Sequence, residues 1–260
     1  MAQDISGTPV ELPSVSEDIK ADVHVAICTP SHEGVTDAYA HSLFMAGLRF
    51  CQTDFIRNGK TLTKAIGRIN VRGSILPALR ESIARQALLK PSLTHMLWID
   101  SDMVFPHDII WRLWKHDLDV VGANCPRKML PTIPTCETMT PPEKLWTRAN
   151  STGLEETGRI GFGVLMVKRD VFRDLPEPWF PFTYDYKVRG YDGEDTNFCR
   201  LLEAKGVRMW VDHDLSKEIQ HTGPFNYDHC MCEEWTGGET TNVIEVDELG
   251  KPIVKEQVAA

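Results

Sequence analysis

The sequence predicts a layered α/β fold in which helices flank a mostly parallel central sheet. Two patterns lead to this prediction: short apolar runs rich in β-branched residues, and, between them, segments whose apolar residues recur at helical spacing. Such alternation is typical of parallel sheets covered on both faces. The length of 260 residues fits one large domain. We expect this domain over 21–236, with flexible tails at 1–20 and 237–260.

Each expected element has a local signal. The run VHVAICTP is mostly apolar, rich in residues that favour strands, and ends at Pro30, and HMLWID carries an apolar run before its final aspartate. Pro106 suits a first helical turn, and Gly206 suits the end of a helix. In chain order we expect a strand at 23–30, a helix at 37–52, a strand within 53–62, a helix at 75–90, a strand at 95–100, a helix at 106–117, a strand at 118–126, a strand leading into a short helix at 161–175, a helix at 195–206 and a strand at 207–215. The Pro- and Thr-rich segment 126–158 predicts a loop or a short hairpin.

Composition and charge restrict the class of protein. Hydrophobic residues make up 42% and charged residues 25%, which is ordinary for a globular protein in water. The formal net charge of -9 disfavours bulk nucleic-acid binding, because phosphate backbones need a basic surface. No apolar run approaches the ~20 residues of a membrane span, and the acidic N-terminus lacks the apolar core of a signal peptide. The seven cysteines have no regular spacing, which argues against a framework of disulfide bonds. We expect a cytoplasmic protein with reduced thiols and no transmembrane segment.

The motif DSD at 100–102 directly follows an apolar run. Neighbouring carboxylates repel each other, and a cation beside them removes the repulsion. Carboxylate oxygens suit Mg²⁺ or Mn²⁺, and Mg²⁺ held by one or two carboxylates keeps coordination positions for substrate phosphates. Ligands of parallel sheets bind at the carboxyl ends of strands. We therefore interpret Asp100 and Asp102 as a platform for a metal and a diphosphate. The plainer alternative is that Asp100 caps a turn and Asp102 begins one.

Two later motifs also carry chemistry. Glu194 and Asp195 begin an expected helix, where they either cap it, as acids favoured by the helix dipole do, or include a general base for an acceptor hydroxyl. His221, in the run IQHTGPFNY, is either an ordinary turn residue or a metal ligand, since imidazole also suits Mn²⁺.

The order of these motifs resembles that of the GT-A fold glycosyltransferases, close to the family 2-like enzymes of bacteria and phages. The resemblance covers about 23–225 and rests on the apolar strand ending in DSD, followed by GFGVLMVKRDVF, GEDTNFCRLLEAKG and HTG. It implies a Rossmann-like GT-A fold, a UDP- or GDP-linked sugar donor, and Mn²⁺ or Mg²⁺ as cofactor. It further implies that Asp100, Asp102 and His221 bind the metal and that Asp195, or else Glu194, is the base of an inverting transfer.

The resemblance also implies donor contacts. These are Thr29, Pro30, Glu33, Arg80, Asp100 and Ser101. Arg80 matches an arginine that faces the donor in the family, although Glu81 stands where many relatives have Asn. A surface position is the alternative for this arginine.

The acceptor contacts come from an aromatic, Pro-rich stretch. Trp179, Phe180 and Tyr184 lie in PEPWFPFTYDY, where they either stack on a sugar face or pack their own loop down. We assign Trp179 and Tyr184 to acceptor binding. The segment 126–158 is either an acceptor lid or a simple loop.

A zinc site is a weaker hypothesis. His229, Cys230 and Cys232 lie together in HCMCEEW, but a second ligand pair at zinc spacing is missing from the sequence.

The predicted function is metal-dependent transfer of a sugar from a nucleotide-diphosphate sugar to an acceptor hydroxyl, with inversion. Two alternatives stay open. A non-catalytic nucleotide- or sugar-binding module would keep the fold without turnover. A metal-dependent nucleotidyltransferase also uses paired acids, but it usually carries a Gly-rich basic phosphate loop, which CTPSHEG is not.

Overall fold

The structure is a computed structural model that describes residues 20–139, 142–186, 189–224, 226–232, 245–246 and 252–253. The predicted tail at 1–20 lies outside the described residues except for Lys20. The predicted tail at 237–260 does so except for two short antiparallel strands, β15 (Glu245–Val246) and β16 (Pro252–Ile253).

The described part of the chain forms a central sheet of seven strands in the order β4-β1-β5-β9-β7-β12-β8. Their bounds are β1 (Val23–Ser31), β4 (Lys64–Arg72), β5 (His95–Ile99), β7 (Val120–Gly122), β8 (Leu154–Thr157), β9 (Val164–Lys168) and β12 (Met209–Asp212). β1 pairs in parallel with β4 and β5, and β12 with β7, whereas β9 is antiparallel to β5 and β7, and β8 to β12. Only β8 and β9 therefore run against the other five, which confirms the predicted mostly parallel sheet.

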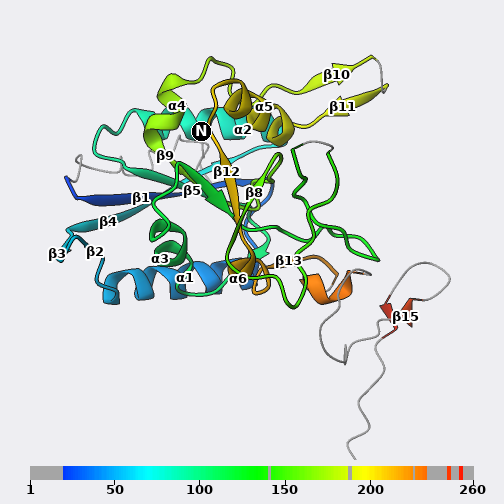
Figure 1. The fold of residues 1–260 in the computed structure, drawn as a ribbon, viewed down its shortest axis with the longest axis horizontal. Coiled ribbons are helices and arrows are strands. Elements are labelled where there is room, and N and C mark those ends of the chain that lie inside the picture. Colours follow the sequence, from blue (N-terminus) through cyan, green and yellow to red (C-terminus); the bar gives the residue numbers. More distant parts are fainter. Residues whose placement is uncertain are drawn as a thin grey trace, which may run out of the picture.

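Helices cover both faces of this sheet (Figure 1). On one face lie α2 (Leu76–Leu88), α4 (Arg169–Asp174) and α5 (Glu194–Ala204), and on the other lie α1 (Asp37–Gln52), α3 (Ile109–Trp114) and α6 (His213–Ser216). Successive side chains of β1 alternate between the layers: Ala26 and Cys28 pack toward the first group, Val25 and Ile27 toward the second. Strands buried on both faces need apolar residues throughout, which is why their sequences are continuous apolar runs. The layered α/β class is confirmed, and the arrangement is consistent with a GT-A-like, Rossmann-like fold.

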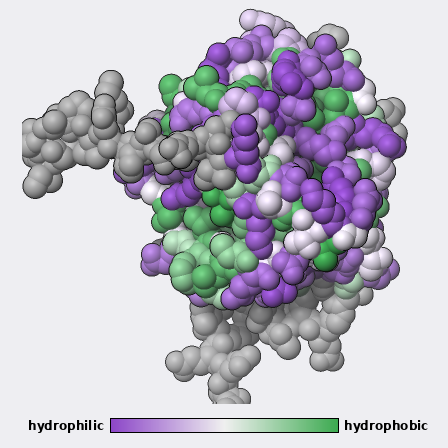
Figure 2. Space-filling model, turned by 90° about the vertical axis from the view of Figure 1, so that its left-hand side faces the viewer, coloured by the Kyte–Doolittle hydropathy of each residue, from purple (hydrophilic) through white to green (hydrophobic). Residues whose placement is uncertain are grey.

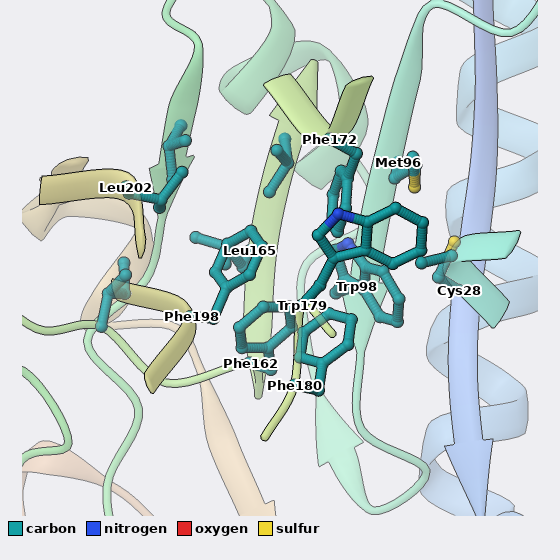
Figure 3. Close-up of a cluster of buried hydrophobic side chains, with 14 of the residues drawn as sticks. Cys28, Met96, Trp98, Phe162, Leu165, Phe172, Trp179, Phe180, Phe198 and Leu202 are labelled. Atoms are coloured by element: carbon teal, nitrogen blue, oxygen red, sulfur yellow. The ribbon is translucent and has the colours of Figure 1, made fainter. Parts of the chain in front are cut away.

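The core under α2, α4 and α5 is aromatic (Figure 3). Trp98 of β5 lies with its ring centroid 5.3 to 6.0 Å from those of Phe162, Phe172 and Phe180. Phe198 of α5 stacks on Phe180 at 5.2 Å. These contacts fix the beginning of α5 relative to the carboxyl end of β5, which are the two chain segments that carry the predicted acids.

Two strands of the sheet differ from the prediction. The expected strand within 53–62 is a small hairpin of β2 (Ile56–Arg57) and β3 (Lys60–Thr61), and the sheet strand β4 follows it. β8 lies inside 126–158, which the sequence predicted as a loop or hairpin. Both β4 and β8 are edge strands with exposed positions, so neither has the continuous apolar run that marks the central strands.

Two smaller units lie at the ends of the strands. A three-stranded sheet joins β6 (Met103–Val104), β13 (Gln220–Thr222) and β14 (Asn226–Tyr227), and a hairpin of β10 (Thr183–Asp185) and β11 (Gly190–Asp192) extends from the body just before α5 (Figure 1). A 3₁₀ turn, η1, spans His229–Met231.

The visible surface is mostly hydrophilic, with apolar side chains gathered in a patch on the face shown in Figure 2. None of the described helices combines the length and the apolar content that crossing a bilayer requires.

Candidate functional site

The backbone brings His221 to the DSD motif. The chain turns at 101–102 after β5, with Met103 N donating to Asp100 O at 3.2 Å, and continues as β6. β6 pairs with β13, so that Met103 lies opposite His221, and Thr222 N donates to Asp102 O at 2.8 Å. The register of this small sheet thus places a histidine far along the chain beside the acids.

Asp102 and His221 form a close pair. His221 Nε2 lies 3.3 Å from Asp102 Oδ1, and His221 Nδ1 lies 3.0 Å from Pro126 O. A carbonyl only accepts, so Nδ1 carries a proton and Nε2 points at the carboxylate. Burial raises the pKa of Asp102, but hydrogen bonds from His221 and Lys128 outweigh this effect and bring the pKa to about 2. Asp102 is therefore ionised at any working pH.

Asp100 is turned toward Arg80. Arg80 Nη2 lies 3.1 Å from Asp100 Oδ1, and Arg80 Nε lies 3.4 Å from Glu194 Oε1. The Arg80 side chain is 3% exposed, and its guanidinium lies over the Phe162 ring, 4.5 Å from the ring centroid. Burial raises the pKa of both Asp100 and Glu194, and the Arg80 charge opposes the rise in each. Arg80 therefore links the DSD motif to the beginning of α5.

Glu194 and Asp195 form the first turn of α5, after Gly193 at its N-cap. Asp195 is half-buried, and its Oδ1 accepts from Thr196 N at 2.7 Å. Its negative charge is close enough to help raise the pKa of Asp100. Glu194 is held by Arg80, so Asp195 is the less restrained of the two acids.

A cavity of about 250 Å³ opens beside Asp100, Asp102 and His221, and neither Glu194 nor Asp195 belongs to its lining. The cavity is slightly smaller than the ~300–1,000 Å³ typical of small-molecule sites. Its lining is Pro30, Ser31, His32, Gly73, Ser74, Leu76, Leu79, Asp100, Ser101, Asp102 and His221. Three predicted donor contacts, Pro30, Asp100 and Ser101, thus share a cavity wall with the predicted metal ligands.

The other predicted donor contacts lie elsewhere. Thr29 is fully buried, and its hydroxyl is hydrogen-bonded to that of Tyr39. Glu33 is exposed, with its Oε1 3.9 Å from His32 Nδ1. Arg80 is buried behind Asp100 and is absent from the cavity lining. For Thr29 and Arg80 these placements correct the expectation of direct donor contact, because a sealed hydroxyl and a sealed guanidinium cannot reach a ligand in the cavity. The donor contact of the exposed Glu33 stays a prediction.

The structure adds residues that the sequence did not indicate. Lys128 donates to Asp102 Oδ2 from the segment 126–158. Ser31 and Ser74 line the cavity from the end of β1 and from the turn after β4, where Ser74 Oγ lies 3.2 Å from His32 Nε2. For the two serines the sequence signal was position near a strand end, which many non-functional polar residues share, and Lys128 lies in a loop without such a signal.

The residues present fit a divalent cation in part. Neighbouring ligands of an octahedral ion, each about 2.1 Å from it, lie about 3.0 Å apart, close to the 3.3 Å between His221 Nε2 and Asp102 Oδ1. The contact from His221 Nδ1 to the Pro126 carbonyl is the outer-shell hydrogen bond usual for a ligating imidazole. Within the described residues no three His, Cys, Asp or Glu side chains form a ready-made cage. The arrangement suits an ion that uses few protein ligands and many from substrate and water.

Of the predicted acceptor residues, the structure exposes one. Trp179 is 4% exposed and packs on Phe172, with Nε1 donating to Leu175 O at 3.3 Å (Figure 3). Its indole has no open face for a sugar, which corrects its assignment, and Phe180 is buried in the same cluster. Tyr184 is 40% exposed on the β10–β11 hairpin, with its ring 4.9 Å from that of Tyr191.

The His229 region has structural contacts. His229 Nε2 contacts Asn124 O, and Cys232 Sγ lies 4.0 Å from His229 Nδ1. Burial raises the pKa of the Cys230 thiol to about 12 and that of Cys232 to about 11, which disfavours the thiolates that zinc needs. Over the described residues these side chains form no metal-binding group.

Comparison with known proteins supports the fold alone. No protein-family model and no curated protein matches the chain. The crystal structure of A197 from STIV matches 77% of this chain and 86% of its own, with a TM-score of 0.53 and 14% identity. The crystal structure of GalNAc-T7 with UDP, GalNAc and Mn²⁺ matches 83% of this chain but only 45% of its own, with a TM-score of 0.43 and 12% identity. The first match shows a shared fold, and the second is too weak to carry an argument.

Proposed function

We propose that the chain is a metal-dependent glycosyltransferase of GT-A type, family 2-like, with its catalytic domain over 21–236. It transfers a sugar from a UDP- or GDP-linked donor to an acceptor hydroxyl, uses Mn²⁺ or Mg²⁺, and works in the cytoplasm. The observation that carries the proposal is the convergence of the DSD acids, Asp100 and Asp102, and the distant His221 on one cavity.

In this proposal the chain holds the donor at the carboxyl end of β5. Asp102 and His221 Nε2 would hold the metal ion, with Asp100 completing the carboxylate platform. When bound, the ion supplies Lewis-acid stabilisation of the leaving diphosphate. Pro30 and Ser101, with Ser31 and Ser74, form the wall against which the nucleotide lies.

Asp195 takes the proton from the acceptor hydroxyl as it attacks the sugar. A base on the acceptor side implies inversion at the anomeric carbon. Glu194 remains the second candidate, but the Arg80 contact holds it in place beside Asp100, which suits a positioning residue better than a base.

The acceptor approaches along the β10–β11 hairpin. This hairpin leads directly into α5, and Tyr184 and Tyr191 are 40% and 68% exposed. Aromatic faces of this kind suit sugar rings, so we assign Tyr184 to acceptor binding and no longer Trp179.

The test is a thermal-shift screen with UDP, GDP and CDP, each with and without Mn²⁺. We expect a shift that needs both nucleotide and metal, lost in Asp102→Asn and kept in Asp119→Asn. Asp119 is a matched control because its carboxylate is 58% exposed and pairs with Lys168, away from the cavity lining. The nucleotide that gives the shift then selects the nucleotide sugars for a transfer assay, which EDTA should abolish.

Other outcomes favour the alternatives. A shift with a sugar alone favours a binding module, and a shift restricted to nucleoside triphosphates favours a nucleotidyltransferase. Transfer that continues in EDTA contradicts the metal role.

A further inference from the structure

Lys128 is a cation that already lies at the proposed metal site. Its ammonium donates to Asp102 Oδ2, while His221 Nε2 faces Oδ1 of the same carboxylate. Both oxygens of Asp102 are thus engaged, one by a lysine and one by a histidine. A divalent cation that binds Asp102 must meet this ammonium.

The loop that carries Lys128 is held in place by its own contacts. Arg127 N donates to Ile133 O at 3.0 Å, and Thr132 Oγ1 donates to Arg127 O at 2.6 Å. The same turn supplies the Pro126 carbonyl that contacts His221 Nδ1. The same loop therefore orients the His221 imidazole and places a positive charge on the Asp102 carboxylate. The contacts within the loop thus hold the backbone of Lys128 beside the site.

Charge decides what happens when a metal arrives. Without it, Arg80 pairs with Asp100 and Glu194, and Lys128 and His221 contact Asp102. A divalent cation at Asp102 repels the ammonium a few ångströms away. The Lys128 side chain is 35% exposed on a flexible four-carbon stem, so it is free to leave. The nearest large negative charge is then the diphosphate that the metal brings.

We propose that Lys128 and the divalent cation exchange at Asp102: the ammonium neutralises the carboxylate while the metal is absent, and on metal binding it moves to donate to the diphosphate of the donor. This inference rests on the proposed function for the identity of the ligand. It assigns Lys128 as a phosphate-binding residue of the donor site.

The exchange predicts effects of opposite sign for a single substitution. Lys128→Met removes a competitor of the metal, and it also removes a donor to the diphosphate. Metal binding without nucleotide should become tighter, while nucleotide binding at saturating metal should become weaker. An ordinary surface ion pair would not give the two opposite effects, because a lysine that never contacts the nucleotide leaves nucleotide binding unchanged when it is removed.

The experiment compares wild type, Lys128→Met and Arg127→Met. Arg127→Met is the matched control, because this substitution removes one positive charge from the position next to Lys128 in the same loop. Free Mn²⁺ is followed by electron paramagnetic resonance as each protein is titrated. Binding of UDP, GDP and CDP is then measured by calorimetry at saturating Mn²⁺.

For Lys128→Met we expect the Mn²⁺ dissociation constant to fall about fivefold and that of the bound nucleotide to rise about fivefold, since each effect corresponds to roughly one partly exposed ionic contact. Arg127→Met should stay within about twofold in both, as an outward-facing charge does. Unchanged or weaker Mn²⁺ binding in Lys128→Met overturns the exchange, and so does unchanged nucleotide affinity. Either result leaves the proposed function standing if wild type binds nucleotide only with Mn²⁺. A wild-type protein that binds no Mn²⁺ overturns both.

Discussion

Replacing Arg80 by methionine tests the buried ionic link between the DSD motif and α5. The guanidinium is 3% exposed and lies 3.1 Å from Asp100 and 3.4 Å from Glu194. Methionine keeps most of the aliphatic stem, but it removes the guanidinium that lies over Phe162 and leaves two largely buried carboxylates without their shared counterion. Removing one partner of a buried ion pair costs about 3–5 kcal/mol. Because Asp100 is 29% exposed and water reaches it, we expect about 3 kcal/mol.

The assay is urea unfolding at pH 8, with Arg85→Met as control. Arg85 is on the same helix and pairs with Glu81 and Glu177, but it is 53% exposed, so its loss should cost less than about 1 kcal/mol. With slopes of about 3 kcal/mol per molar urea, Arg80→Met should unfold about 1 M earlier than wild type.

The pH dependence adds a second check. Burial raises the pKa of Asp100 and Glu194, and Arg80 limits the rise, so its removal raises both pKa values further. The native variant then binds more protons than its unfolded chain, and its stability relative to wild type improves as pH falls. The destabilisation should therefore be smaller at pH 5 than at pH 8. An Arg80→Met protein no less stable than Arg85→Met, or equally destabilised at both pH values, would refute the buried link.

Three further predictions concern other parts of the chain. Asp195→Asn should lower transfer about 10²–10⁴-fold, as loss of a general base does, while the nucleotide- and Mn²⁺-dependent thermal shift remains; full transfer activity contradicts the base assignment. Burial, with Lys168, lowers the pKa of His95 from 6.5 to about 4, so between pH 7 and pH 5 the unfolded chain takes up a proton that the native protein does not, and stability falls by about 2 kcal/mol; urea unfolding of His95→Gln should show a loss smaller by that amount, and an equal loss contradicts it. A Cβ at Gly122 would lie 2.4 Å from Val164 O, whereas a Cβ at Gly67 meets nothing within 4 Å. Gly122→Ala should therefore lower the melting temperature sharply and Gly67→Ala only slightly. Similar decreases in melting temperature for the two variants would contradict the close packing at Gly122.

The central strands and the DSD acids were predictable because their signals are local. β5 and β9 are buried on both faces, so their sequences are continuous apolar runs, and the acids of the DSD motif stand where the β5 run stops. The beginning of α5 was predictable for the same kind of reason, since acids favour the first turn of a helix. The edge strands β4 and β8 were missed because exposure on one side breaks the apolar run that identifies a strand.

The environments of the site residues depended on contacts between distant segments. Arg80 and Trp179 were both assigned to ligands from their residue types, yet packing buries each of them, one behind Asp100 and the other in the aromatic core. Residue type indicates what a side chain can contact, but burial decides what it does contact.

By itself the sequence determined the α/β class, the place of the acids at a strand end and the acids that begin α5, because each depends on neighbours a few positions away. Only the tertiary structure decided that His221 lies 3.3 Å from Asp102 and that Lys128 is on its other oxygen. The reason is physical: the register of β6 against β13 is set by backbone pairing between segments about 100 residues apart, and the loop after β7 meets this small sheet through the contact of Pro126 O with His221. A local pattern does not record which partner a strand end will find.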